Sequence, residues 1–85
     1  MRAIERKALA AFNECRPFKE SNTEVVVTKE SVCVYLFGNM IVWKDRTTGE
    51  VSYSHCGWHT PTTASRLRAF GANAYIRKGT LIIEK

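Results

Sequence analysis

The sequence lacks several features that would assign it to a class at once. Its longest apolar run, residues 32–37, is much shorter than the ~18 residues that a membrane-spanning helix needs. The N-terminal stretch MRAIERKALAAF carries too many charges for a secretory signal, so we expect the protein to stay in a cytoplasm. No internal repeat, low-complexity tract or linker is visible, which predicts a single domain over residues 1–85.

Cysteine is scarce and odd in number. The three cysteines, Cys15, Cys33 and Cys56, stand among apolar residues. A small secreted scaffold would carry more cysteines in even number. We therefore expect buried free thiols in a reducing compartment, which agrees with a cytoplasmic location.

Charge of one sign is never concentrated, because no run of five or six like charges occurs. The chain is nevertheless basic, with 13 Lys and Arg against 8 Asp and Glu and a net charge of +5. This balance favours polyanionic partners, meaning nucleic acid or acidic protein surfaces.

Two stretches have the periodicity of amphipathic helices. Over residues 2–15, apolar side chains recur at spacings of three and four, and Pro17 ends the pattern. Over residues 60–70, Thr60 can cap the helix N-terminus and Pro61 suits the first helical position. The arginines of this second helix are expected on its solvent side.

Between and after the helices the period changes to two, as in β-strands. The predicted strand regions are residues 23–28, 31–45, 50–55 and 74–85, and a polar connector over 19–23 precedes them. Within them, Gly38-Asn39 and Lys78-Gly79 suit two-residue hairpin turns. The order of helix, three or four strands, helix and terminal hairpin predicts a small antiparallel α+β fold.

A turn at Gly38-Asn39 would fix the pairing of the central hairpin, with Phe37 opposite Met40. The predicted core face is Cys33, Tyr35, Phe37, Met40, Val42, Val51 and Tyr53, and the second face is centred on Leu36, Ile41 and Trp43. Both faces are apolar, so both need a cover. A chain this short supplies little core of its own, so we predict a homodimer that buries the second face unless the N-terminal helix covers it.

The densest group of reactive side chains is His55, Cys56 and His59. Imidazole and thiolate ligate zinc, but neighbouring strand residues point to opposite faces and no second pair has ligand spacing, so we expect no metal. Cys56 beside a histidine resembles a nucleophile with its base. No acidic residue lies nearby to orient the imidazole, and a short chain leaves little room for an enclosed pocket, so neither enzymatic activity nor a cofactor is expected.

The predicted binding surface starts in the same stretch, because threonines and arginines at a helix N-terminus suit an anion such as phosphate. Its members are Trp58, His59, Thr62, Arg66, Arg68, Tyr75, Arg77 and Lys78. Three interpretations stay open: a contact surface for a partner protein, a grip on DNA or RNA phosphates, or a loop that only starts a helix followed by solvated arginines.

Two motifs carry a resemblance to known proteins. Gly38 and Asn39 end a hydrophobic strand, and residues 57–67 read Gly-Trp-x-Thr-x-Thr-Thr-x-x-Arg-Leu. Over residues 34–84 the chain thereby resembles a group of small proteins encoded by tailed bacteriophages, although Arg68 stands where those proteins commonly carry Asn. The resemblance implies a phage source and the cytoplasm of a bacterial host. Since such proteins generally act by binding, we expect a non-enzymatic protein that modulates or inhibits a host protein in host takeover or defence evasion, with nucleic-acid binding as the alternative.

Overall fold

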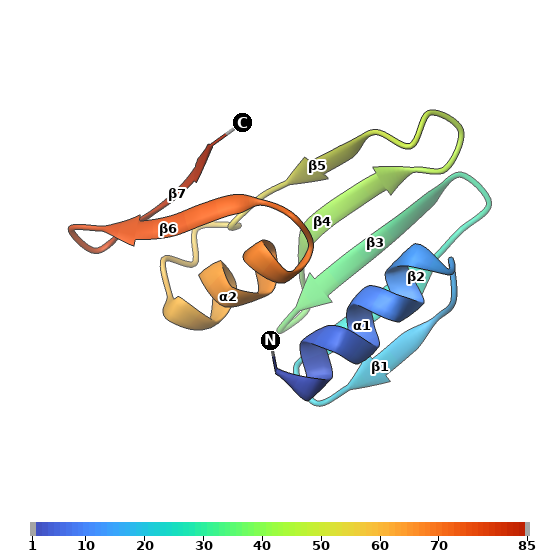
Figure 1. Cartoon of the computed structure of the whole chain (residues 1–85), viewed down its shortest axis with the longest axis horizontal. Helices are drawn as coiled ribbons and strands as arrows, with labels where there is room; N and C mark the ends of the chain where they lie inside the picture. The colour runs from blue at the N-terminus through green and yellow to red at the C-terminus, as the bar shows by residue number, and fades with distance from the viewer. Residues whose placement is uncertain (1, 85) are drawn as a thin grey trace.

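The computed structural model describes residues 2–84 of the protein, with two helices and seven strands (Figure 1). In chain order these are α1 (Ala3–Asn13), β1 (Phe18–Glu20), β2 (Thr23–Val27), β3 (Ser31–Leu36), β4 (Asn39–Asp45), β5 (Val51–Tyr53), α2 (Pro61–Ala69), β6 (Asn73–Arg77) and β7 (Thr80–Glu84). The first five strands form one antiparallel sheet in sequence order, and β6 and β7 form a separate hairpin. The predicted antiparallel α+β fold is confirmed.

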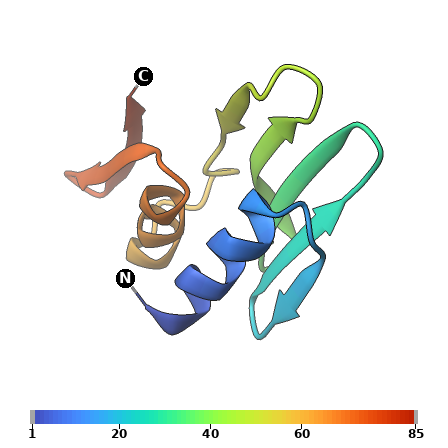
Figure 2. The same cartoon turned by 45° about the vertical axis from the view of Figure 1, so that its right-hand side comes forward.

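Both helices lie on one side of the five-stranded sheet, with α2 between α1 and the C-terminal hairpin (Figure 2). The small buried side chains of Ala8 and Ala11 let α1 approach the sheet closely. The start of α2 is as predicted, since the Thr60 hydroxyl accepts a hydrogen bond from the Thr63 N–H and Pro61 occupies the first helical position. Neither helix within residues 2–84 is long and apolar enough to cross a bilayer.

The polar connector predicted over residues 19–23 is wrong, because β1 starts at Phe18 and occupies part of it. Phe18 pairs with Val25 and packs against the core, and Lys19 pairs with Glu24. An edge strand needs only backbone hydrogen bonds and one anchoring side chain, so its polar composition hides it from a search for hydrophobic alternation.

The central hairpin turns one residue earlier than predicted. Phe37 and Gly38 occupy the turn with φ of 51° and 79°, and Leu36 pairs with Asn39. A two-residue turn of this kind needs positive φ at both central positions. The Asn39 amide supports it by donating to the carbonyls of Leu36 and Phe37 at 3.5 and 3.3 Å.

A β-bulge then changes the register inside the hairpin. Tyr35 pairs with Met40 while Val34 pairs with Val42, so Ile41 is an extra residue on β4. The bulge lets Ile41 join the core, although Val42, its neighbour in sequence, is also buried there. Strict alternation along β4 therefore fails at this point.

The bulge puts Ile41 and Val42 on the same side of the sheet, and the predicted core face is right only in part: Val42 lies in the core, and Val51 and Tyr53 pack against it. The helix-covered face carries Val25, Val32, Val34, Leu36, Ile41 and Val42, all in the core. The opposite side, which we call the open face, carries Val26, Cys33, Tyr35, Met40 and Trp43. Phe37 and Met40, both predicted as core, are 66% and 41% exposed.

The predicted partner face of Leu36, Ile41 and Trp43 does not exist as one surface. Leu36 and Ile41 are buried beneath the helices, whereas Trp43 is 36% exposed on the open face. The bulge at Ile41 puts Ile41 and Trp43 on opposite sides of the sheet, although residues two positions apart in a regular strand share a face.

Candidate binding site

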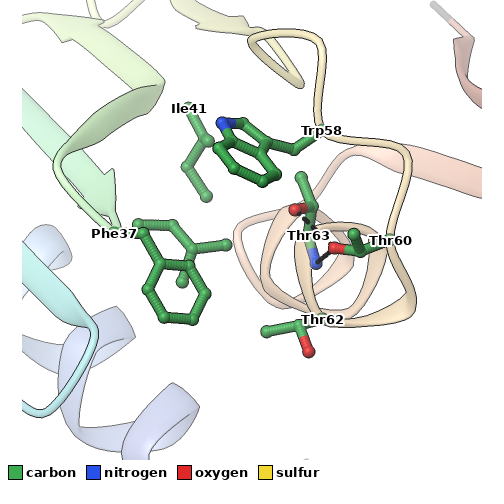
Figure 3. A pocket seen from close by; sticks show the side chains of 7 residues that line it. Phe37, Ile41, Trp58, Thr60, Thr62 and Thr63 are labelled. Carbon is green, nitrogen blue, oxygen red and sulfur yellow. Dashed lines mark hydrogen bonds between the residues drawn. The ribbon is translucent and has the colours of Figure 1, made fainter.

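An apolar pocket of about 500 Å³ lies between the β3–β4 turn and the first turn of α2 (Figure 3). Its lining residues are Leu36, Phe37, Ile41, Trp58, Thr60, Thr62 and Thr63. Leu36 and Ile41 are buried, and the rings of Phe37 and Trp58 stand at its sides with 66% and 52% of their surfaces exposed. A pocket of this size and apolar character is typical of a binding site.

Two similar backbone turns hold the aromatic rings of the pocket. Phe37 itself has positive φ in its turn, and Cys56 and Gly57, with φ of 52° and 80°, precede Trp58. A bulky residue in the left-handed region is strained by about 1–2 kcal/mol, a cost that residues such as Gly or Asn largely avoid. The chain therefore keeps an exposed aromatic ring at a position where its backbone would favour another residue, which marks Phe37 as a candidate binding residue.

The loop between β5 and α2 is braced by its histidines. His55 Nδ1 accepts a hydrogen bond from the Gly57 N–H at 2.9 Å, and His59 Nδ1 accepts one from the Leu81 N–H at 2.8 Å. The two rings lie 4.5 Å apart between centroids. His59 therefore joins the loop that carries Trp58 to strand β7, a role that only tertiary structure reveals.

The reactive side chains of this loop are occupied by backbone groups. The Cys56 thiol donates to the Met40 carbonyl at 2.9 Å. A neutral imidazole has one lone-pair nitrogen, and in both histidines a backbone amide uses it. Within residues 2–84, no group of three or more His, Cys, Asp or Glu is placed to hold a metal ion. All three cysteines are free, but only Cys33 is buried; Cys15 is half-buried and Cys56 is exposed, so the expectation of three buried thiols is wrong.

Arg66, predicted on the solvent side of α2, is instead buried, with only 3% of its surface exposed. Its Nη1 lies 2.7 Å from a Glu5 carboxylate oxygen, and its Nε donates to the Thr23 hydroxyl at 3.1 Å. The Ser65 hydroxyl also donates to Glu5, at 2.6 Å. Burial alone would raise the pKa of Glu5, but hydrogen bonds from Ser65, the Arg2 N–H and Arg66 outweigh it and hold this pKa below the ordinary value.

The other predicted basic residues do not gather into one surface. Arg68 is exposed, but its guanidinium donates to the Ala74 carbonyl at 3.1 Å. Arg77 and Lys78 are exposed at the tip of the β6–β7 hairpin. The Tyr75 hydroxyl donates to Glu84 at 2.6 Å, and this hydrogen bond raises the pKa of Tyr75.

The start of α2 also offers less to an anion than its sequence indicates. Pro61 has no N–H, and the Thr63 N–H is bonded to the Thr60 side chain, so Thr62 alone keeps a free amide in this turn. Of the predicted binding residues, the pocket brings together Trp58 and Thr62. It adds Phe37, which the predicted hairpin pairing had assigned to the core.

Neither the curated proteins nor the solved structures include a significant match to this chain. A family model described as Kyanoviridae Gp96 protein matches residues 1–85, so the likeness includes the N-terminal helix as well as the residues that carry the two motifs. The Kyanoviridae are tailed phages, and the resemblance to tailed-phage proteins is confirmed. The chain belongs to the Kyanoviridae Gp96 protein family.

Proposed function

We propose that this phage protein is a non-enzymatic binding protein that modulates a host protein, with the pocket between Phe37 and Trp58 as its contact site. The supporting observation is the exposure of both rings, 66% and 52%, on either side of an apolar pocket. Aromatic residues are enriched at protein interfaces and supply a large share of binding energy. The tight turns fix the backbone that carries each ring, so binding need not order this backbone.

The pocket is suited to an apolar side chain from the partner's surface. Its lining includes the buried side chains of Leu36 and Ile41, and Thr60, Thr62 and Thr63 line it on the side of α2 (Figure 3). The net charge of +5 favours a partner whose surface around that side chain is acidic, because opposite charges speed association. Binding through this pocket would inhibit the host protein if the phage protein covered the host protein's own functional site.

Nucleic-acid binding is the competing function. It depends on exposed basic residues, and two of the predicted ones make contacts within the protein. The predicted binding surface has four arginines and lysines that could contact phosphates, and of these Arg66 is buried in an ion pair and Arg68 donates to a backbone carbonyl. Arg77 and Lys78 remain; they are exposed at the β6–β7 turn and are not among the residues that line the pocket. Two such residues would give only a weak, salt-sensitive interaction.

The test is capture of partners from host lysate by tagged full-length protein, with and without nuclease, followed by reconstitution with the purified candidate. The variants Phe37→Ser and Trp58→Ala should each abolish most of the capture and weaken the reconstituted complex by at least about tenfold, the effect of losing an aromatic anchor. Ile76→Ala is the matched control, because Ile76 is an exposed apolar residue that lies outside the pocket.

Two results would overturn the proposal. One is a host partner that Phe37→Ser and Trp58→Ala capture as strongly as the control variant does. The other is tight binding of the purified protein to DNA or RNA that falls steeply with salt and is lost in Arg77→Ala/Lys78→Ala, without any nuclease-resistant partner.

A further inference from the structure

A second groove, of about 610 Å³, separates β5 from the C-terminal hairpin. One wall is β5, and the other is formed by the start of β6 and the end of β7. Figure 1 shows these three strands. Val51 and Tyr53 line the first wall, Ile83 lines the second, and Ala72 contributes to the floor. This groove shares no residue with the pocket between Phe37 and Trp58.

The wall made by β5 is an unpaired strand edge, since β5 is the last strand of its sheet. The Asp45 N–H donates to the Glu50 carbonyl, and the Ser54 N–H donates to the Ile41 carbonyl. Residues 50, 52 and 54 therefore direct their backbone groups towards β4. Because direction alternates along a strand, Val51 and Tyr53 direct their N–H and C=O groups into the groove.

The opposite wall is a second strand edge. The Leu81 N–H points away from β6, because it donates to His59 in the loop that follows β5. Ile83 is two residues further along β7 and directs its backbone groups to the same side. The groove thus lies between two strand edges whose outward donors and acceptors, at Val51, Tyr53 and Ile83, pair with no other strand of residues 2–84.

The floor of the groove is fixed and apolar. The Tyr53 hydroxyl donates to the Phe70 carbonyl at 2.8 Å, which joins β5 to the end of α2. A β-carbon at Gly71 would lie 3.1 Å from this hydroxyl, so the floor is closely packed. Tyr53, Val51 and Ile83 all pack against the core from this side.

The rim of the groove is acidic, in contrast to the whole chain. Glu50 and Glu84 line it, and neither forms a salt bridge with a base among residues 2–84. Among the residues that the structure describes, the Glu84 carboxylate accepts hydrogen bonds from the neutral side chains of Asn73 and Tyr75. By alternation, Glu84 points to the side of the hairpin opposite Ile83, away from the floor.

We propose that this groove binds an extended, basic segment of a partner protein, which adds as a strand between β5 and β7. Strand addition would use the free backbone groups of both edges. A segment in which apolar residues alternate with Lys or Arg would place the apolar side chains on the floor and the cations beside Glu50 and Glu84. The inference concerns a different surface from the proposed docking pocket, and the two can fail independently.

The test uses the full chain, ¹⁵N-labelled, and the synthetic peptide acetyl-Lys-Val-Lys-Val-Lys-amide as the probe. Titration to millimolar peptide should shift the amide resonances of Val51, Tyr53 and Ile83. The same peptide with both valine nitrogens methylated loses donors to a strand edge and should bind at least about fivefold more weakly, as should a peptide with Glu in place of Lys.

Substitutions in the protein give the second arm of the test. Val51→Pro removes an N–H that faces the groove but keeps the ladder to β4, a position where an edge strand tolerates proline. It should weaken peptide binding by about tenfold, while the matched Val51→Thr and the pocket variant Phe37→Ser should not. If Val51→Pro fails to fold, the methylated peptide decides the question.

Three results would overturn the inference. The first is no shift at Val51, Tyr53 and Ile83 with the basic peptide, and the second is equal binding of the methylated peptide. The third is a concentration-dependent shift of the same amides in the protein alone, because a second copy of the chain would then occupy the groove.

Discussion

The two sides of helix α2 show opposite distributions of polar and apolar groups. Towards α1, a charged pair is buried: Arg66 and Glu5 meet at 2.7 Å, and Ser65 and Thr23 complete their hydrogen bonds. Towards the loop that precedes it, the helix adjoins an apolar pocket beside the exposed Trp58. The charged pair is thus buried between the two helices, whereas the apolar pocket on the other side stays exposed to solvent. Our proposed host protein would bury that pocket.

The ion pair buried between α1 and α2 bears on how α1 packs against α2. Replacing one member of a buried ion pair leaves the other charge without a partner, which is far more costly than losing an exposed pair. The apolar residues of α1 are mostly small, and they can pack in more than one alignment against β-branched strands. We infer that the pairing of Glu5 with Arg66 favours this alignment of α1 against α2 over others.

The largest expected effect follows from breaking that pair. Arg66→Ala should destabilise the protein by about 3–5 kcal/mol, because it leaves the buried Glu5 carboxylate unpaired. Arg68→Ala, on the exposed side of the same helix, should cost within about 1 kcal/mol. Urea unfolding of both variants checks the comparison, and equal losses would show that the buried pair contributes no more than a surface arginine.

Lowering the pH should also remove the stability that the ionised Glu5 carboxylate contributes, but gradually. The pKa of Glu5 is lower in the folded chain than its ordinary value, so the folded state binds fewer protons than the unfolded state in the acid range. Stability from this group is therefore complete above the unfolded pKa and is lost as pH falls through the folded one. Glu5→Gln should show a lower stability at neutral pH and a flatter decline below pH ~5 in thermal unfolding. An unchanged acid profile in this variant would assign the decline to other carboxylates.

How much of this contrast the sequence predicts depends on the range of the interactions. The cap at Thr60 and the turn at Lys78-Gly79 are local, and both are confirmed. Arg66 was misplaced because its partner is 61 positions away and a helical arginine is ordinarily solvated. No local pattern distinguishes this arginine from Arg68.

The pocket was missed through an error of one residue. Both Phe37-Gly38 and Gly38-Asn39 can form a two-residue turn, and the second is the commoner composition. Choosing it moves Phe37 from the turn into the strand and shifts the pairing by two residues, so that Tyr35 is placed opposite Val42 and not Met40. The bulge at Ile41 has no sequence signal such as glycine, so the burial of both Ile41 and Val42 follows only from the tertiary structure.

An intermediate effect is expected at Phe37, where stability and binding should change in opposite directions. Phe37→Asn relieves a left-handed backbone strain and should stabilise the isolated chain by about 0.5–1 kcal/mol. The same variant should lose capture of the host protein, because it removes a ring from the pocket. Thermal unfolding and the reconstituted binding assay measure the two quantities. A destabilised variant would mean that the ring contributes to the fold of the free protein.

The smallest effect on stability is expected on the open face, where we now place the predicted homodimer contact. Trp43 and Met40 are exposed on this face, and we propose that two copies of the chain meet there. Trp43→Ser should change the unfolding free energy of the monomer by less than about 1 kcal/mol but shift the mass in light scattering from dimer to monomer.

Ile41→Glu provides the contrasting variant, because Ile41 is buried beneath the helices and a carboxylate there should unfold the chain. Had Ile41 belonged to the same exposed contact as Trp43, as the predicted pairing required, both variants would give a folded monomer. A folded monomeric Ile41→Glu protein would therefore restore the predicted hairpin pairing. If the wild-type protein is monomeric at all concentrations, the homodimer prediction is wrong, and Trp43 is an exposed side chain without a dimer contact.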